Sequence, residues 1–501
     1  MEIAVHKLDR KTPPPLCILV MTPCLLLSLA GCNTLTDRPE LSPDKFAPPS
    51  AQREWEPSSA IARQRDLSQS SIAAAVPQSM ETESGRPFDL SGLIDIALRH
   101  NPRTRRAWEA ARSAAATYGA SRSPYYPQVS VESDSGYTRI PFELPGAFGA
   151  VKQWQTDNQV ALTYTLIDFG RRASASEQAR EQLIAANFSA NRTIQDVVFG
   201  VEQTFYAFDA VEAAVEAARI NFTLAKADFD SVKQRVDLGL ATQPELLLAQ
   251  ERLAQSRFDV ANADQLLRDA QANLAVALGI AADTTFEVQP LYNEPVPKSL
   301  SQDVETLIAE ARRSRPDLAA RKAQVRASDA AIEQARAQWF PTVGTAGVYG
   351  ENVWNYTFGG PPSVQISTPQ YSAMLTIKWD LFTGFRRLND VRKAKADREV
   401  ASADLKTLEI DAVAEVWRAY YEFQSSLSKY EYAQSLFASS QESYAANSES
   451  YRQGLSTIVE LLTAQRDLAN ARYTLIQSKS ELLTAYAAVA YSIGRVDLPS
   501  K

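Results

Sequence analysis

Two very long stretches without proline constrain this chain more than any other feature. Residues Arg171 to Leu238 and Arg386 to Gln453 contain no proline and almost no glycine. Proline breaks a helix interior and glycine weakens it, so each stretch is predicted to be a single helix. At 1.5 Å per residue, such a helix is on the order of 100 Å long. The mean helix of a globular domain has only about 11–12 residues, so the chain is not an ordinary globular domain.

The two stretches belong to two copies of one unit. Gly239-Leu240-Ala241-Thr242 is matched by Gly454-Leu455-Ser456-Thr457, an offset of 454 − 239 = 215. Further matches follow in the same order along both copies. Asn101-Pro102 is matched by Arg315-Pro316 near the start, and Leu278-Gly279 by Ile493-Gly494 near the end. The predicted domains are a signal peptide (1–31), an N-terminal tail (32–87), a first repeat (88–280), a linker (281–303), a second repeat (304–495) and a C-terminal tail (496–501).

Each repeat has the same predicted internal order. A short helix (about 91–99 or 303–313) ends before a proline, because the residue preceding proline disfavours the helical conformation. A second helix follows (about 103–122 or 317–338), then an extended region and the long helix. A returning helix closes the unit (about 243–278 or 458–493).

The extended regions alternate between apolar and polar residues, which is the period of a β-strand. In the first repeat the apolar positions include Val160 and Leu162, and in the second they include Tyr371 and Leu375. Val129 and Val131 indicate a partner strand in the first repeat, whereas the stretch after Pro341 gives a weaker signal. The stretches 140–155 and 354–369 contain proline and glycine and are predicted to be long hairpin loops. The expectation is four strands per chain.

The returning helices carry a strict seven-residue repeat, which winds a helix left-handedly around a neighbour. Small residues occupy every second position of the seam and allow a close approach of the backbones. In the first repeat the leucine positions and small positions are Leu246, Leu253, Val260, Leu267, Leu274 and Ala249, Ser256, Ala263, Ala270, Ala277; in the second they are Leu461, Leu468, Leu475, Leu482, Val489 and Ala464, Ala471, Ser478, Ala485, Ser492.

The N-terminus has the pattern of an export signal, with basic residues before an apolar run from Leu16 to Leu29. Leu29-Ala30-Gly31-Cys32 resembles the bacterial lipobox, which implies cleavage before Cys32 and acylation of its thiol, for example with palmitate. The residue after the cysteine is Asn33. An aspartate at this position would resemble an inner-membrane retention signal, so its absence favours the outer membrane. No other long apolar stretch follows, so a membrane-crossing part would have to consist of strands closed into a barrel.

The composition argues against several classes of function. The chain has 52 Lys and Arg against 59 Asp and Glu without a basic cluster, so nucleic acid is not an expected partner. Only His6 and His100 occur, and His6 would be removed with the signal peptide. The remaining histidine and the single acylated cysteine cannot form a Cys/His zinc site. No phosphate-binding loop or hydrolase motif is present. We therefore expect no enzyme activity, no metal site and no cofactor.

The whole arrangement resembles the TolC family of outer membrane factors over residues 88–495. The resemblance includes the strand-to-helix segments Leu166–Arg171 and Leu381–Arg386 and the turns Val236–Thr242 and Tyr451–Thr457. It implies a mixed α+β membrane protein and a homotrimer. Each chain would contribute four strands to a 12-stranded barrel that continues into a coiled-coil periplasmic tunnel. The implied function is an outer-membrane exit duct, in contact with outer-membrane lipid, a periplasmic adaptor and an inner-membrane pump.

The same resemblance assigns roles to residues near the two turns. Six residues would contact the adaptor: Gly239, Leu240, Thr242, Gly454, Leu455 and Thr457. Glu460 matches an acidic ring at the periplasmic aperture, and Glu245 and Tyr451 match gate residues. Thr463 stands where members of the family often have an acidic residue, and Ser456 stands where they can have an arginine. Because of these two differences, the resemblance does not determine which bonds would hold the gate closed. The alternative for both glutamates is a helix-start acid, which is favourable by itself.

Two other functions fit parts of the sequence. A periplasmic adaptor also has an export signal, a lipobox and a helical hairpin, but it has one hairpin flanked by lipoyl-like strands rather than two hairpins 215 residues apart. A structural coiled-coil lipoprotein would not need the alternating strands. The sequence does not indicate a transported substrate.

Overall fold

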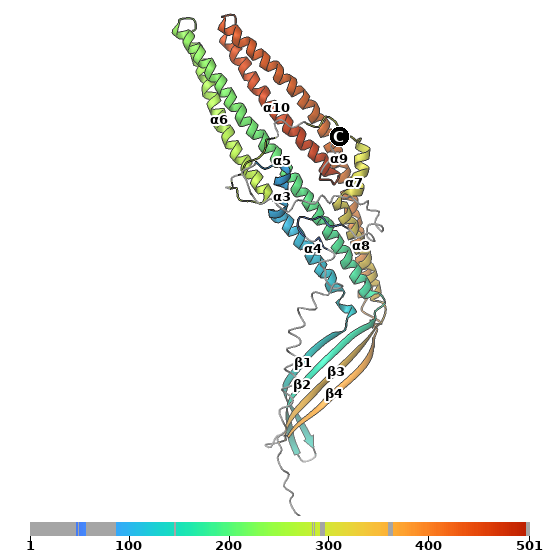
Figure 1. Cartoon of the computed structure of the whole chain (residues 1–501). Coiled ribbons are helices and arrows are strands. Elements are labelled where there is room, and N and C mark those ends of the chain that lie inside the picture. Colours follow the sequence, from blue (N-terminus) through green and yellow to red (C-terminus); the bar gives the residue numbers. More distant parts are fainter. Residues whose placement is uncertain are drawn as a thin grey trace, which may run out of the picture.

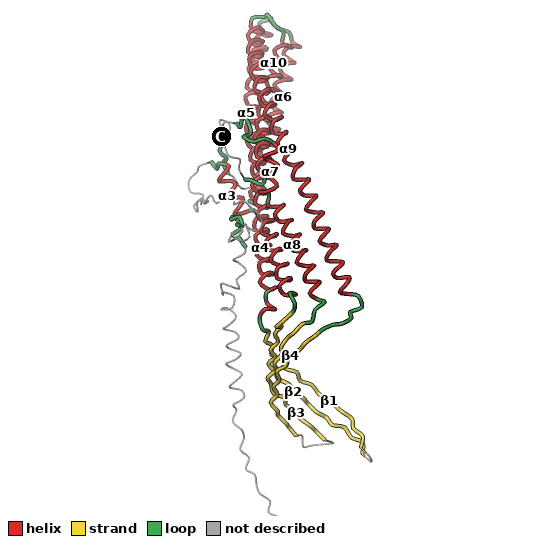
Figure 2. Tube along the Cα trace, turned by 90° about the vertical axis from the view of Figure 1, so that its right-hand side faces the viewer, coloured by secondary structure: helices red, strands yellow, loops and turns green. Residues whose placement is uncertain are grey.

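The computed structural model describes residues 47–48, 50–56, 87–144, 147–282, 284, 286–290, 296–358 and 364–496. The predicted signal peptide and Cys32 lie outside these residues. The described chain is elongated, with paired long helices at one end and a curved four-stranded sheet at the other (Figures 1 and 2). No helix in the described part of the chain is both long enough and apolar enough to cross a membrane.

Within the residues that the structure describes, the α-helices occur in two sets of four. The first set is α3 (Leu90–His100), α4 (Pro102–Ser121), α5 (Arg171–Asp237) and α6 (Gln243–Leu278); the second is α7 (Val304–Ser314), α8 (Pro316–Ala337), α9 (Arg386–Arg452) and α10 (Ile458–Ser492). Both long helices, α5 and α9, have 67 residues. Asn101 separates α3 from α4 and its side chain accepts a hydrogen bond from the backbone N–H of Arg103. All eight helices were predicted, with ends within two residues.

The sheet has strands β1 (Gln128–Leu144), β2 (Ala147–Ile167), β3 (Thr342–Phe358) and β4 (Val364–Lys378). All neighbours are antiparallel in the order β1-β2-β3-β4, so β2 and β3 join the two repeats. One cross-strand row is Val131, Val160, Tyr349 and Tyr371, and the adjacent row on the opposite face is Glu132, Gln159, Gly350 and Gln370. The register therefore confirms the predicted alternation between an apolar and a polar face.

The predicted long loops at 140–155 and 354–369 are wrong, because most of these residues continue the strands. Pro141 lies in β1 and Pro369 in β4. Within the sheet of one chain both are edge strands, where a residue without an N–H group does not interrupt the pairing of a central strand. The strand after Pro341 was weakly predicted because glycines interrupt its pattern. At Gly350 a Cβ atom would collide with the carbonyl oxygen of Asn158 on β2, so close backbone packing favours glycine there.

The helices pair as two antiparallel hairpins, α5 with α6 and α9 with α10. The predicted small seam residues are buried at Ala249, Ala263 and Ala270 in the first hairpin, and Ala464, Ala471 and Ala485 are buried in the second. Leu274 and Leu482 are fully buried beside them. Burial of these positions confirms the seven-residue seam, since small residues let neighbouring helices approach closely.

The two repeats meet where α5 packs on α8. Phe188 on α5 packs in one apolar cluster with Ala320 and Ala323 on α8. Trp55 from the N-terminal segment completes this cluster, with its ring 5.1 Å from that of Phe188. An ion pair of 2.9 Å between Glu181 and Arg326 also crosses the junction. The apolar cluster around Phe188 and the ion pair of Glu181 with Arg326 thus join the two repeats.

Candidate functional site at the hairpin tips

Two glycine turns close the hairpins at the end of the molecule far from the sheet. Gly239 has φ +70° and Gly454 has φ +77°, the left-handed conformation that glycine adopts without steric cost. The following N–H groups, of Leu240 and Leu455, donate to the carbonyl oxygens of Arg235 and Ser450 at 2.7 and 2.8 Å. These bonds satisfy carbonyls at the ends of α5 and α9, as in a Schellman-type helix end. The predicted turn geometry is confirmed.

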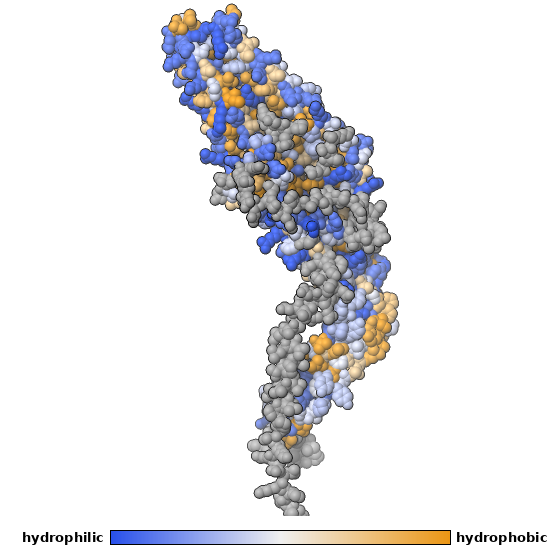
Figure 3. Space-filling view, viewed as in Figure 1, coloured by the Kyte–Doolittle hydropathy of each residue, from blue (hydrophilic) through white to orange (hydrophobic). Residues whose placement is uncertain are grey.

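The six tip residues predicted from the resemblance lie on the surface of these turns. Leu240 is 65% exposed and Leu455 is 77% exposed, and Leu238 beside them is also exposed. Gly239, Thr242, Gly454 and Thr457 are exposed as well. Hydrophobic surface is visible at the ends of both hairpins (Figure 3). Large apolar side chains at such a solvent-exposed end are suited to contact with another protein.

Glu460 and Glu245 begin the returning helices in equivalent positions. One carboxylate oxygen of Glu460 accepts a hydrogen bond of 2.7 Å from the backbone N–H of Thr457, and the Thr457 hydroxyl accepts one of 3.3 Å from the N–H of Glu460. Glu245 accepts from the N–H of Thr242 at 3.3 Å. Both acids therefore belong to capping boxes, which satisfy free N–H groups at a helix start. Glu460 and Thr463 are exposed on the same helix.

Tyr451 lies between the two hairpins and is only 4% exposed. The guanidinium group of Arg235 sits 4.8 Å from its ring and donates to the carbonyl oxygens of Tyr451 and Arg452 at 2.9 and 3.2 Å. Burial, together with the negative charge of Glu245, raises the pKa of Tyr451. The carboxylate of Glu245 on α6 thus acts electrostatically on Tyr451 at the end of α9. The structure adds Arg235, which joins α5 to the end of α9.

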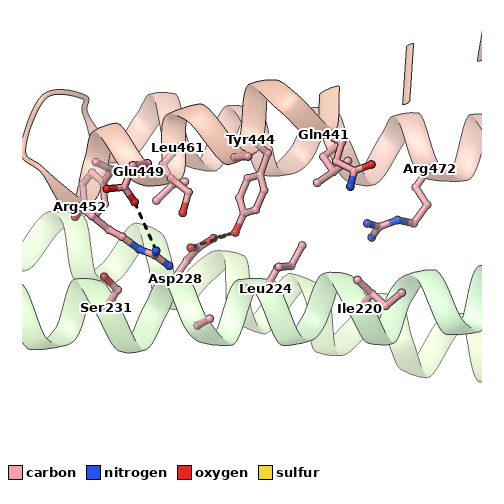
Figure 4. A pocket seen from close by; sticks show the side chains of 15 residues that line it. Ile220, Leu224, Asp228, Ser231, Gln441, Tyr444, Glu449, Arg452, Leu461 and Arg472 are labelled. Atoms are coloured by element: carbon pink, nitrogen blue, oxygen red, sulfur yellow. Dashed lines mark hydrogen bonds and ion pairs between the residues drawn. The ribbon is translucent and has the colours of Figure 1, made fainter. Parts of the chain in front are cut away.

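A pocket of about 490 Å³ separates the hairpins next to Tyr451 (Figure 4). Asp228 projects into it from α5, and the hydroxyl of Tyr444 on α9 donates to the Asp228 carboxylate at 3.1 and 3.3 Å. Burial raises the pKa of Asp228 to about 6, although the hydrogen bond from Tyr444 and the charge of Arg452 lower it. The lining residues labelled in the figure are Ile220, Leu224, Asp228, Ser231, Gln441, Tyr444, Glu449, Arg452, Leu461 and Arg472.

Three polar residues of α5, spaced seven residues apart, form hydrogen bonds with the second hairpin. Asn221 accepts a hydrogen bond of 2.6 Å from Arg472, Asp228 accepts from Tyr444, and Arg235 donates to the carbonyl of Tyr451. The sequence interpretation missed this polar column. Its signal is the heptad spacing of Asn221, Asp228 and Arg235, which the counterparts Leu436, Ser443 and Ser450 on α9 do not repeat.

Comparison with known proteins agrees with this geometry. The model of the outer membrane efflux protein family matches residues 93–280 and 307–495, which is most of both repeats. The chain belongs to the outer membrane efflux protein family. This family is one of outer-membrane channels and not of enzymes. Among the described residues, no group of three or more His, Cys, Asp and Glu side chains is placed to hold a metal ion.

Individual members of the family match along most of the chain. Protein CyaE of Bordetella pertussis is 30% identical over 409 residues, which cover 80% of this chain and 84% of that protein. The solvent efflux pump outer membrane protein SrpC of Pseudomonas putida is 26% identical over 500 residues, covering 94% and 96%. The solved structure of the outer-membrane channel OprN matches with a TM-score of 0.71 at 22% identity, covering 81% of this chain and 89% of that one. The last match establishes the fold.

Proposed function

We propose that this chain forms a homotrimeric exit duct in the cell outer membrane for a tripartite efflux or secretion system. Three copies would join their sheets into a twelve-stranded barrel and their hairpins into a coiled-coil tunnel through the periplasm. A periplasmic adaptor would bind the tips, and an inner-membrane pump would supply the substrate. Names such as that of SrpC support an efflux role, while the cargo would be selected by the pump.

The open sheet is the observation that supports this proposal most directly. Within the described strands, β1 pairs only with β2 and β4 only with β3, so both edges are open. Four strands are too few to close a barrel, because about eight are needed to enclose even packed side chains. The strands have 15 to 21 residues, more than the roughly 9–11 that span a bilayer. An apolar face toward lipid and a polar face toward water fit a membrane barrel.

The tips supply the proposed adaptor site and aperture. Exposed Leu240 and Leu455, with Gly239, Thr242, Gly454 and Thr457, would contact the hairpins of the adaptor. Glu460 from three copies would converge at the aperture, with Thr463 one turn further along α10. Tyr451 and Glu245 would belong to the gate, since the electrostatic effect of Glu245 on Tyr451 depends on the two hairpins lying together.

A lipid anchor on Cys32 is a further part of the proposal. Mass spectrometry of the mature N-terminus should find an acylated Cys32, and Cys32→Ala should abolish this modification while the strands still insert. An intact Met1 or an unmodified cysteine in the mature protein would exclude the anchor. The two alternatives, a periplasmic adaptor and a structural coiled-coil lipoprotein, do not account for an open sheet of such long strands.

The function can be tested with purified protein in planar bilayers. The native mass in detergent should be three times that of the mature chain, and the protein should form discrete conductance steps. A monomer, or a trimer without conductance, would contradict the duct. Adaptor binding is tested separately by pulling down the complex from membranes with Leu240→Asp plus Leu455→Asp. These exposed changes should leave the trimer intact and remove the adaptor, whereas retained adaptor would exclude the tip contact.

A further inference from the structure

In the proposed barrel, the side of the sheet that carries Val131 faces lipid, and its apolar part is short. Val131 of β1, Tyr349 of β3 and Tyr371 of β4 are 72%, 70% and 81% exposed in the single chain. The apolar residues continue toward the helices as far as Trp379, which is 379 − 371 = 8 residues from Tyr371 and 57% exposed. At about 3.4 Å per residue and a strand tilt of about 40°, this apolar band is roughly 20 Å high. Outer-membrane barrels have an apolar band of about 25 Å between two aromatic girdles, so the band marks the hydrocarbon layer.

Farther from the helices, the same side of the sheet becomes polar. It carries the alternate residues from Ser133 to Arg139 of β1, paired with those from Asn158 to Lys152 of β2, and we call these four rows the distal belt. Hydrogen bonds of 2.7 and 3.1 Å join serine to asparagine and serine to threonine in its first two rows. Its last row lies 139 − 131 = 8 residues beyond Val131. The distal belt therefore extends about 20 Å above the apolar band, at the same rise and tilt.

The last row of the distal belt consists of two cations. Arg139 and Lys152 are direct partners across β1 and β2, so their Cβ atoms lie about 4.5–5.5 Å apart. Like charges in such a pair repel each other, and neither side chain forms an ion pair with another described residue. A phosphate group between them would accept charge-assisted hydrogen bonds from both and would remove the repulsion. The charge of this row thus favours an anionic ligand.

The row below the cations consists of two exposed aromatic residues. Tyr137 and Trp154 are 56% and 50% exposed, and their ring centroids are 6.5 Å apart. Such rings combine an apolar body with a polar tip and are suited to a layer that is partly apolar and partly wet. The C–H face of a sugar packs on an aromatic ring, and the hydroxyl and amide groups of the first two rows can hydrogen-bond to sugar hydroxyls. The aromatic row is therefore suited to bind sugar rings.

We propose that the distal belt binds the phosphorylated glycolipid of the outer leaflet, with Arg139 and Lys152 on its phosphate groups and the other rows on its sugars. This inference rests on the proposed barrel, which places the belt directly above the acyl chains of the surrounding lipid. The headgroup layer of a phospholipid leaflet is only about 5–8 Å thick, so it does not reach the cations. A glycolipid with several sugars extends far enough to contact all four rows.

Single cysteines in the Cys32→Ala background test which layer surrounds the belt. Trimer with Val131→Cys, Asp134→Cys or Ser135→Cys is reconstituted into phosphatidylethanolamine vesicles with or without bacterial lipopolysaccharide, a glycolipid of this class, and treated with a water-soluble maleimide. Ser135→Cys should react in the phospholipid vesicles and lose this reactivity when the glycolipid is present. Asp134 lies on the opposite side of β1, toward the lumen, so Asp134→Cys should react in both vesicles. Val131→Cys should react in neither.

The outcomes separate the belt from the barrel. Equal labelling of Ser135→Cys in the two vesicles, or no labelling in either, would overturn the glycolipid contact. Reactive Val131→Cys or unreactive Asp134→Cys would instead contradict the proposed barrel, because these positions report the lipid and the lumen.

Removal of the two cations tests the phosphate contact. Each basic residue near an anionic membrane surface contributes about fivefold in affinity, so Arg139→Gln with Lys152→Gln should weaken lipopolysaccharide binding by about twenty-fivefold. Binding is measured by native mass spectrometry of the detergent-solubilised trimer. Lys226→Gln with Lys233→Gln is the charge-matched control, since both lysines are exposed on α5, far from the sheet. Wild type should also bind dephosphorylated lipopolysaccharide as weakly as the double variant binds the intact glycolipid.

Two results of this measurement would contradict the assignment. Equal binding by wild type and the Arg139→Gln, Lys152→Gln variant would exclude the cations as phosphate ligands. Binding of inorganic phosphate that excess lipopolysaccharide does not displace would show an anion site unrelated to the lipid. A chain that forms no trimer at all would contradict the proposed duct rather than only the belt.

Discussion

Asp228 is a single carboxylate whose burial depends on the contact between the two hairpins. Its pKa is about 6 in the folded protein, raised chiefly by burial, against an ordinary value of 3.8. A raised carboxyl pKa means that the folded state binds the proton more tightly than the unfolded chain does. The stabilisation is therefore complete below about pH 4 and is lost as the pH rises through 6, by at most roughly 3 kcal/mol.

The substitution Asp228→Asn removes this charge and keeps an acceptor for the Tyr444 hydroxyl. We expect Asp228→Asn to have a higher thermal unfolding midpoint than wild type at neutral pH. Between pH 4 and 6 the variant should also lack the decrease of the midpoint that titration of Asp228 causes in wild type. Asp230→Asn is a matched control, because Asp230 is exposed on the same helix. If the thermal midpoint of Asp228→Asn depended on pH as that of wild type does, the Asp228 carboxylate would be hydrated in the folded protein and burial would not raise its pKa.

Glu460 has two separable roles at the residue scale, as a helix cap and as a charge. Glutamine can replace glutamate in a capping box, so Glu460→Gln keeps the acceptor for the Thr457 N–H and removes only the charge. If three carboxylates converge on the duct axis, wild-type channels should prefer cations and be blocked by multivalent cations. Single-channel recordings of Glu460→Gln should show both effects reduced. Equal selectivity and block in the two proteins would leave Glu460 with its capping role alone.

At the scale of an element, the seam of small residues sets how closely α6 can approach α5. Ala270 is 9% exposed and packs in the cluster that contains Val201, Phe205 and Leu274. Ala270→Leu adds three carbons to this interface, and overpacking of that kind typically costs about 1–3 kcal/mol. We expect a lower thermal midpoint and less assembled trimer. Asn262→Leu is the control, since positions 262 and 477 are exposed in both hairpins; equal loss in the two variants would contradict a close-packed seam.

At the scale of the whole molecule, the N-terminal segment holds the two repeats together. The N–H of Trp55 donates to the side-chain oxygen of Asn191 at 3.0 Å, and the Asn191 amide returns a bond of 3.2 Å to the carbonyl of Trp55. The ring packs on Phe188 of the first repeat and on Ala323 of the second. Further back, the carbonyl of Pro48 accepts a hydrogen bond of 2.9 Å from the Trp108 indole on α4.

Removal of the Trp55 side chain should weaken the contact between the two repeats. Trp→Ala in a buried site costs about 3–5 kcal/mol, so Trp55→Ala should lower the thermal midpoint by several degrees and speed protease cleavage near residue 55. Glu56→Ala, at an exposed neighbouring position, should change neither. Slow cleavage and an unchanged midpoint in Trp55→Ala would show that helix packing alone joins the repeats.

The sequence by itself determined the helices, the repeat and the tip turns, because each depends on local rules. The absence of proline fixed the extent of α5 and α9, and heptads of leucine and alanine marked the buried seams of α6 and α10. A glycine followed by Leu-Ala-Thr or Leu-Ser-Thr was enough to locate each turn and the helix-start glutamate after it. Family features in these same segments also indicated the mixed α and β fold that the structure has.

Only the tertiary structure decided the length of the strands and the contacts between the hairpins. Proline and glycine indicate loops by local preference, but Pro141 lies on a sheet edge and Gly350 against a neighbouring backbone, which cannot be read before the strand order is known. Likewise Asp228 and Tyr444 are 216 residues apart and acquire their shifted pKa values only when α5 and α9 bury them together. Desolvation is a property of packed elements, and no short segment of the sequence contains it.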